Sequence, residues 1–313
     1  MYTHGIHTLD TGFQRPRFDA AYLVVENDRG AFVDCGTSHA LPRLLAALGE
    51  AGLAPADVDF LILTHVHLDH AGGAGALMRA LPNARLVVHP RGARHMIDPA
   101  ALVAGATAVY GEAEMARSYG EIVPVPAERV SVAEDGYVVD LAGRPLLCID
   151  TPGHARHHLA VYDARAKVWI TGDSFGLSYR ELDTEQGAFI LPTSSPVQFE
   201  PEAMKHSIAR MLEQRPEGML LTHYGRVGAD FGQVRKLAGD LCAQIDAMVE
   251  LARAADDRAD RHRRLLDALS ALYLRRTREH GVVLADAQVL DLLGMDIELN
   301  AQGLACWLDR DRR

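Results

Sequence analysis

Short apolar runs separated by polar turns dominate the first two thirds of the chain. Runs of this kind, bounded by glycine or Asn-Asp, are typical of β-strands, and they fall at residues 6–10, 21–25, 31–34, 60–64, 86–90, 130–132, 137–139, 145–149, 159–162, 168–170 and 219–222. Helical periodicity predicts helices at residues 41–51, 99–119 and 204–214. Strands and helices that come in two successive groups predict an α/β fold with two mixed sheets and helices outside them.

The pattern changes after residue 228. Apolar residues recur at helix spacing in four stretches, which begin near residues 241, 265, 289 and 304. We therefore predict a first domain at residues 1–228 and an all-helical extension at residues 229–313. The extension would act as a substrate lid or as a dimerisation element, since surplus apolar helix surface is compatible with a homodimer.

Composition and charge exclude several classes of protein. The formal net charge of −10 opposes binding to nucleic acid, and no basic stripe occurs outside the C-terminal helices. No apolar run approaches the roughly 20 residues that a membrane-spanning helix needs. The start of the chain lacks the basic and then apolar pattern of a secretory signal, so we expect a cytoplasmic protein without a membrane partner. The cysteines form no CxxC pair, which argues against a thiolate zinc site: Cys35, Cys148, Cys242 and Cys306.

One hexapeptide carries a concentration of metal-ligand side chains. The sequence HVHLDH at residues 65–70 follows an apolar run directly and precedes a glycine-rich stretch, so it lies on a strand-to-helix turn. Alternate side chains of an extended stretch share a face, so His65 and His67 can hold one ion together. Asp69 and His70 lie past the turn and suit a second ion. By itself the hexapeptide allows one ion or two.

Three later segments also place a ligand-type side chain directly after an apolar run and beside a glycine. These side chains are His154, Asp173 and His223. Because each follows a predicted strand, we expect the loops to present them at the edge of a sheet. The glycines allow the backbone to turn closely enough for each side chain to point inward.

The hexapeptide and these three residues, in this order, resemble the metallo-β-lactamase superfamily over roughly residues 1–230. The resemblance implies an αββα sandwich with a dinuclear metal site at one edge of its two sheets. Carried over residue by residue, the ligands would be His65, His67 and His154 for one ion, Asp69, His70 and His223 for the other, and a bridging Asp173. Asp34 matches a family aspartate that orients a ligand, a role in which carboxylates fix histidine tautomers. Three histidines match no ligand position and are expected to be structural, His158 being the best placed to support a ligand: His89, His157 and His158.

The resemblance implies that the site activates water. Two divalent cations, with zinc expected and iron or manganese as alternatives, would share a bridging hydroxide that attacks an electrophile. The implied catalytic residues are Asp69, which would steer the proton, Asp173, which would hold both ions, and Tyr224, which would donate to the developing oxyanion. An exposed or core-facing Tyr224 without a catalytic role is the simpler alternative.

The sequence leaves the substrate open. Thioesterases of the glyoxalase II type, quorum-signal lactonases and phosphodiesterases share this ligand set, so we expect hydrolysis of a thioester, a lactone or a phosphodiester. The C-terminal helices are similar in placement to those of glyoxalase II and of the quinolone-signal response thioesterase. The apolar residues 187–192 predict a lid over a medium-sized, partly apolar small molecule. Two other functions remain open: an iron enzyme acting on persulfide or oxygen, and a partner-binding regulatory protein on the same scaffold.

Overall fold

Two six-stranded sheets face each other in the computed structural model, which describes residues 4–255 and 260–311. The first sheet has the strand order β1-β2-β3-β4-β5-β6, with bounds Ile6–Asp10, Ala20–Glu26, Arg29–Val33, Val58–Ile62, Arg85–Val88 and Val130–Val132. The second has the order β12-β11-β10-β9-β8-β7, and its strands β7 to β12 are Tyr137–Leu141, Arg144–Asp150, Leu159–Asp163, Val168–Gly172, Gly218–Leu221 and Gly225–Val227. Both sheets are mixed, as the sequence predicted, because β3 to β6 pair in parallel and β10 pairs in parallel with β11.

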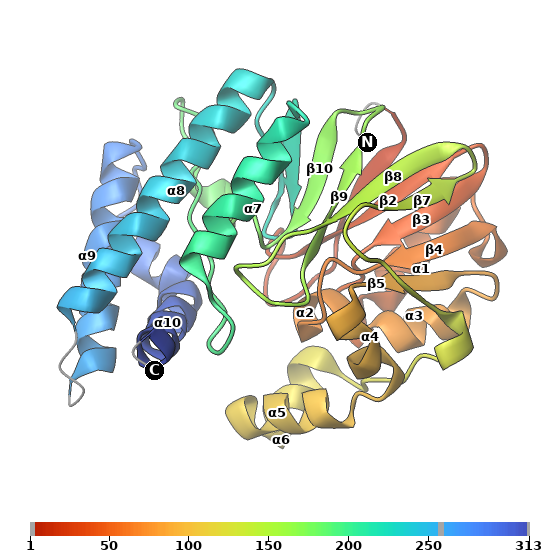
Figure 1. The fold of residues 1–313 in the computed structure, drawn as a ribbon, viewed down its shortest axis with the longest axis horizontal. Helices are drawn as coiled ribbons and strands as arrows, with labels where there is room; N and C mark the ends of the chain where they lie inside the picture. Colours follow the sequence, from red (N-terminus) through yellow and green to blue (C-terminus); the bar gives the residue numbers. More distant parts are fainter. Residues whose placement is uncertain (1–3, 256–259, 312–313) are drawn as a thin grey trace.

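Helices cover the outer face of each sheet, so that the layers follow the order helix, sheet, sheet, helix (Figure 1). The helices between the strands of the first sheet are α1 to α6, with bounds Leu41–Glu50, Leu68–Ala71, Ala74–Ala80, Pro90–Ile97, Ala100–Tyr110 and Glu112–Glu114. Helix α7, Pro201–Glu213, lies on the second sheet. Short 3₁₀ helices and one π-helical turn complete the connections, at Ser38–Ala40, Pro55–Asp57, Ala127–Arg129, Arg180–Leu182 and Met115–Tyr119.

Apolar side chains fill the space between the sheets. Alternate residues of β2 and β3, such as Tyr22, Val24 and Val33, meet residues of the second sheet, such as Val161 and Ile170, in one buried cluster. Their neighbours in the strands point the other way, toward the helices, because successive side chains of a strand lie on opposite faces. This arrangement is the αββα sandwich that the sequence predicted.

The C-terminal extension is helical throughout its described part and packs beside α7 on the second sheet (Figure 1). It contains α8, Phe231–Ala254, α9, Arg261–Glu279, and α10, Asp286–Asp311. The prediction of four helical stretches was wrong in one respect, because the third and the fourth form the single helix α10. No proline interrupts that helix, and its buried residues Leu293, Ile297 and Leu304 continue one apolar stripe across the expected break.

The extension and the second sheet share one hydrophobic core, which includes residues of α7 to α10 and of β9 to β12. The division into domains at residue 228 stays a prediction. Within the described residues, no helix combines the length and the apolar character that crossing a bilayer requires.

The segment between β10 and α7 belongs to this core as well. Phe189, Ile190 and Leu191 are at most 2% exposed and pack among the helices of the extension. The amide of Gln244 donates to the Ile190 carbonyl at 2.7 Å, and the amide of Asn300 donates to the Pro192 carbonyl at 3.1 Å. The expectation of an apolar lid at residues 187–192 was therefore wrong, because these side chains join the sheet to the extension.

Candidate metal centre

All seven ligand-type residues identified in the sequence converge at one edge of the sandwich. Each lies in a connection that follows a strand or in the short helix after it. His65 and His67 follow β4, Asp69 and His70 belong to α2, and the others follow β8, β10 and β11: His154, Asp173 and His223. Ligand atoms from three subsets of these residues lie within 4.8 Å of one another.

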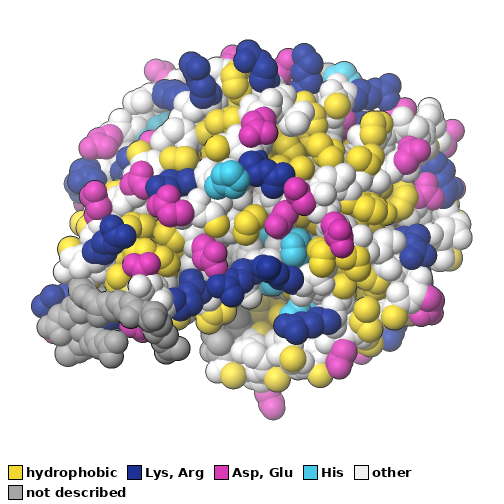
Figure 2. All heavy atoms as spheres, viewed as in Figure 1, with side chains coloured by type: hydrophobic (Ala, Val, Ile, Leu, Met, Phe, Trp, Pro, Cys, Tyr) yellow, Lys and Arg dark blue, Asp and Glu magenta, His cyan; other side chains and the backbone are white. Residues whose placement is uncertain are grey.

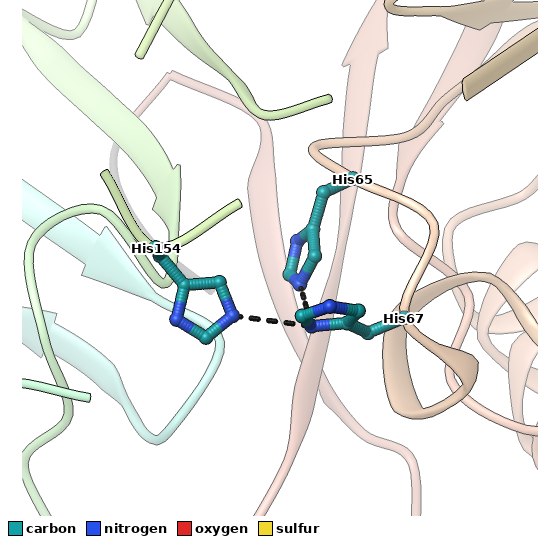
Figure 3. A group of neighbouring side chains, drawn as sticks. All are labelled: His65, His67 and His154. Atoms are coloured by element: carbon teal, nitrogen blue, oxygen red, sulfur yellow. Dashed lines mark hydrogen bonds between the residues drawn. The ribbon is translucent and has the colours of Figure 1, made fainter. Parts of the chain in front are cut away.

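The first subset consists of three histidines whose rings point toward one another (Figure 3). Nδ1 of His67 lies 2.9 Å from Nε2 of His65 and 3.1 Å from Nε2 of His154. An imidazole nitrogen carries either one proton or one lone pair, so a single nitrogen cannot form good hydrogen bonds to both neighbours. Three converging nitrogens at this spacing are instead suited to a shared cation.

The second subset places histidine nitrogens beside two carboxylates. Nε2 of His70 lies 3.5 Å from an Asp69 oxygen, and Nε2 of His223 lies 3.5 Å from the same oxygen. Asp173 lies between the two subsets: its Oδ2 is 3.3 Å from Nε2 of His154, whereas its Oδ1 is 3.4 Å from Nε2 of His70. The carboxylate of Asp173 is therefore placed as a bridge would be.

Hydrogen bonds from outside the cluster orient three of these histidines. Nδ1 of His154 donates to the Thr193 carbonyl at 3.1 Å, and Nδ1 of His223 donates to the Phe18 carbonyl at 3.0 Å. Nδ1 of His70 lies 2.9 Å from Oδ2 of Asp34. Donation from Nδ1 leaves the Nε2 lone pair of each neutral ring directed into the cluster. Asp34 thus contacts His70 as expected for a residue that orients a ligand.

Two atoms in the cluster test whether a metal would fit. Nε2 of His70 and Oδ1 of Asp173 are buried and have no hydrogen-bond partner in the structure. Unpaired buried polar atoms are costly, and both atom types are ordinary ligands of divalent cations. The cysteine nearest the cluster is not one of the donors, because the Cys35 thiol lies 3.3 Å from the His70 carbonyl oxygen. The donors therefore fit divalent cations that accept nitrogen and oxygen.

The electrostatics of the two subsets differ. Burial, reinforced by neighbouring imidazoles, lowers the pKa values of His65 and His67 well below their ordinary range. Burial would also lower the pKa of His223, but the carboxylates of Asp173 and Asp69 outweigh it and raise this pKa to about 10. The same carboxylates raise the pKa of His70 above its ordinary value against the effect of burial. The second subset thus favours bound positive charge, which a cation would supply.

Solvent reaches the cluster from one side. His67 and Asp69 are the two ligand-type residues with intermediate exposure, whereas the other five are buried. Behind the cluster, the buried ring of His158 stacks on that of His65, and its Nε2 accepts a hydrogen bond from the Asp173 amide at 3.1 Å. His158 therefore supports the ligands from the closed side, the part for which it was the best placed of the three other histidines.

Tyr224 is half-buried, and its ring packs against the apolar cluster between the sheets. This placement matches the core-facing alternative for the side chain. Its role as an oxyanion donor stays a prediction.

Several residues next to the cluster were not identified from the sequence. Phe18 lies edge-on to His223 and stacks on Tyr179, whose hydroxyl donates to Asp296 of α10 at 3.2 Å. Asp296 is 7% exposed, and burial raises its pKa to about 6. A signal for it existed, because Asp296 and Asn300 occupy positions on the apolar stripe of their helix. Phe18 and Tyr179 carried no such signal.

Comparison with known proteins gives a consistent picture. The model of the metallo-beta-lactamase superfamily matches residues 15–223. A metallo-beta-lactamase fold-containing protein of Sulfurisphaera tokodaii, ST1585, is 26% identical over 237 residues, which cover 72% of this chain and 81% of that protein. Its solved structure superposes with a TM-score of 0.63 and 23% identity over 79% of this chain and 87% of that one.

Two relatives carry names that describe an activity. A hydroxyacylglutathione hydrolase of Aeromonas hydrophila is 28% identical over 47% of this chain and 44% of its own length. The acyl-coenzyme A thioesterase MBLAC2 of Gallus gallus is 29% identical over 49% of this chain and 56% of its own length. The matched part thus spans about half of each of these two proteins.

Proposed function

Because this chain belongs to the metallo-beta-lactamase superfamily, we propose that it is a metal-dependent hydrolase and that its substrates are thioesters. One observation carries the proposal: seven histidine and aspartate side chains from separate connections converge, with their outer hydrogen bonds directing free lone pairs inward. Such an arrangement prepares a site for cations before they bind.

Two divalent cations would be held by this cluster. The three-histidine subset would hold one, and Asp69, His70 and His223 would hold the other, with Asp173 between them. When bound, such cations make water nucleophilic near neutral pH and polarise the oxygen of the bond to be cleaved. A donor set of nitrogen and oxygen without thiolate accepts zinc, which we propose, and also iron or manganese.

The residues of the chain divide the remaining work. Hydrolysis adds water to the thioester carbon, breaks the C–S bond and yields a carboxylic acid and a thiol. Asp69 is placed to accept the proton that the attacking water loses, because its carboxylate is 25% exposed on the open side of the cluster. That proton is then available to the departing thiolate. The buried residues behind the cluster, among them Asp34 and His158, keep the ligand rings in place.

The names of the relatives favour thioesters over the other substrates expected from the sequence. Hydroxyacylglutathione hydrolase and acyl-coenzyme A thioesterase both describe cleavage of a thioester. Lactones and phosphodiesters are the alternatives to be compared in the same assay. Oxygen consumption with a persulfide, measured on iron-containing protein, examines the redox alternative.

The test is hydrolysis by purified protein of measured metal content. We expect release of thiol from a generic acyl thioester at a kcat/KM at least about tenfold above that for a simple lactone or a bis-aryl phosphodiester. His67→Ala, which removes one ligand, should lower kcat by at least about 10². His206→Ala, at an exposed position of α7, is the matched control and should leave kcat unchanged. Full activity of His67→Ala, or protein that binds less than about one equivalent of added metal, would contradict the proposal.

A further inference from the structure

A second polar cavity lies beside the three-histidine subset. Its volume is about 460 Å³, and its lining residues are Pro90, Arg91, Arg94, His95, Arg156, His157 and Gln198. His157 belongs to both places, because its ring lines the cavity and its centroid lies 5.5 Å from that of His67 and 6.1 Å from that of His65. One imidazole ring therefore separates the cavity from the candidate metal ligands.

The charge of this cavity is opposite to that of the whole molecule. Arg91 and Arg94 are exposed on α4, and neither has a carboxylate within ion-pair distance among the residues that the structure describes. Arg156 is compensated, because it forms an ion pair with Glu200 at 2.6 Å. Two uncompensated guanidinium groups thus face one cavity in a chain of net charge −10. In Figure 2, dark blue and cyan side chains gather below the centre of the face, near the position of α4 in Figure 1.

Hydrogen bonds hold the walls of the cavity together. Nη1 of Arg91 donates to the Arg156 carbonyl at 3.3 Å, which joins α4 to the segment after β8. The Arg156 amide donates to the side-chain oxygen of Gln198 at 2.7 Å, which joins that segment to the one before α7. Nε of Arg94 lies 3.3 Å from Nε2 of His95. The cavity is therefore built from three separate parts of the chain that contact one another.

We propose that this cavity binds an anionic group, a phosphate or a carboxylate, in the thiol half of the substrate. Guanidinium groups pair with both kinds of oxyanion through forked hydrogen bonds, whereas a neutral thiol would gain nothing from them. The inference rests on the proposed thioesterase function. It adds that the enzyme selects thiols by charge: glutathione would offer carboxylates, and coenzyme A would offer phosphates.

The first test compares acetyl thioesters of three thiols. N-acetylcysteamine is neutral, glutathione carries carboxylates and coenzyme A carries phosphates. We expect the kcat/KM of the wild type for at least one charged thioester to exceed that for the neutral one by about tenfold, through KM, and this advantage to shrink in 0.5 M salt. The preferred thiol identifies which oxyanion binds.

Variants locate the effect in the cavity. The double variant Arg91→Ala/Arg94→Ala should abolish the advantage of the charged thioester, measured as the ratio of the two kcat/KM values. Arg91→Lys/Arg94→Lys should retain part of it, because the charge stays while the fork is lost. Arg235→Ala, at an exposed position of α8, makes the same change elsewhere and should keep the full ratio. A ratio near one in the wild type, or a ratio that the double variant leaves intact, would overturn the inference.

A binding measurement decides the matter even if no thioester is cleaved, which would refute the proposed function itself. Pyrophosphate is titrated calorimetrically into metal-loaded wild type and into the metal-loaded double variant. Any contribution of the metals is common to both proteins, so the difference reports the cavity. We expect binding of pyrophosphate by the double variant to be at least about tenfold weaker. Equal dissociation constants would refute the anion site.

Discussion

Asp34 connects more of the candidate metal centre than any single ligand does. Its carboxylate contacts Nδ1 of His70 and accepts hydrogen bonds from the amide and the hydroxyl of Thr64 at 2.8 and 2.7 Å. The residue is 1% exposed and has a φ of 57°, in the left-handed region that aspartate and asparagine tolerate better than most residues. An uncommon backbone conformation at such a junction is typical of functional sites.

We predict that Asp34→Asn weakens metal binding without preventing folding. Asparagine suits the left-handed conformation, but its amide group replaces one acceptor oxygen with a donor, so the contacts to His70 and Thr64 cannot all be kept. Loss of such a supporting partner should raise the dissociation constant of the bound metal by about 10- to 100-fold. Competition with a chelator measures this constant, and circular dichroism checks the fold.

Asp59→Asn is the control for this change, because Asp59 lies on the neighbouring β4 and pairs with Arg29 away from the cluster. Its metal constant should equal that of the wild type. Equal metal affinity in both variants would show that Asp34 does not orient a ligand.

At the scale of elements, the connection that carries His154 is tied to the start of α7. Gly153 has a φ of 133°, and a Cβ there would lie 2.3 Å from the Cα of Met204. The Gly153 carbonyl also accepts a hydrogen bond from the Glu200 amide at 2.8 Å. Only glycine lets the ligand-bearing turn and the helix approach so closely.

We predict that Gly153→Ala destabilises the protein by about 2–4 kcal/mol, because the methyl group collides with backbone and the residue must keep an unfavourable φ. Urea unfolding measures the change. Gly239→Ala in α8 makes the same substitution where nothing lies within 4 Å of the new Cβ. It should stabilise the protein by about 0.5–1 kcal/mol, since alanine favours a helix interior. The same sign for both substitutions would contradict this account.

At the scale of the whole molecule, the extension reaches the neighbourhood of the candidate metal centre through α10. Asp296 accepts a hydrogen bond from Tyr179, and its Oδ2 is buried without a hydrogen-bond partner in the structure. Burial raises the pKa of Asp296 to about 6, although the positive charges of His223 and Arg15 oppose the rise. The folded protein therefore holds the proton of this carboxyl more tightly than the unfolded chain, whose aspartates have a pKa of about 3.9.

The sign of the resulting pH dependence follows from this difference. Below pH 4 the carboxyl is protonated in both states, so Asp296 costs nothing. As the pH rises through about 6, ionisation becomes unfavourable in the folded state, and stability falls by up to about 3 kcal/mol. Asp296→Asn cannot ionise and should escape this loss.

We therefore predict that the stability of Asp296→Asn, relative to the wild type, increases by about 1–3 kcal/mol between pH 4.5 and pH 7.5. The measurement is urea unfolding of both proteins after removal of metal with a chelator, so that no bound cation alters the charge of Asp296. Parallel pH curves for the two proteins would show that burial does not raise this pKa.

The fold class and the seven ligand-type residues could be predicted from the sequence because the signals are local. A strand shows itself as an apolar run, and a ligand that follows a strand lies at a sheet edge in any sandwich of this kind. The same local reasoning failed for α10, where an apolar stripe continued through an expected break, and for residues 187–192, whose apolar side chains enter a core instead of covering a cavity.

The sequence by itself thus determined which residues can hold metal and which elements present them. Only the tertiary structure decided that Asp173 lies between the two subsets, that Asp34 contacts His70, and that an arginine-lined cavity borders the three histidines. These facts depend on contacts between segments far apart in the chain. Such contacts are set by how sheets and helices pack, and no periodicity or spacing within one segment reports them.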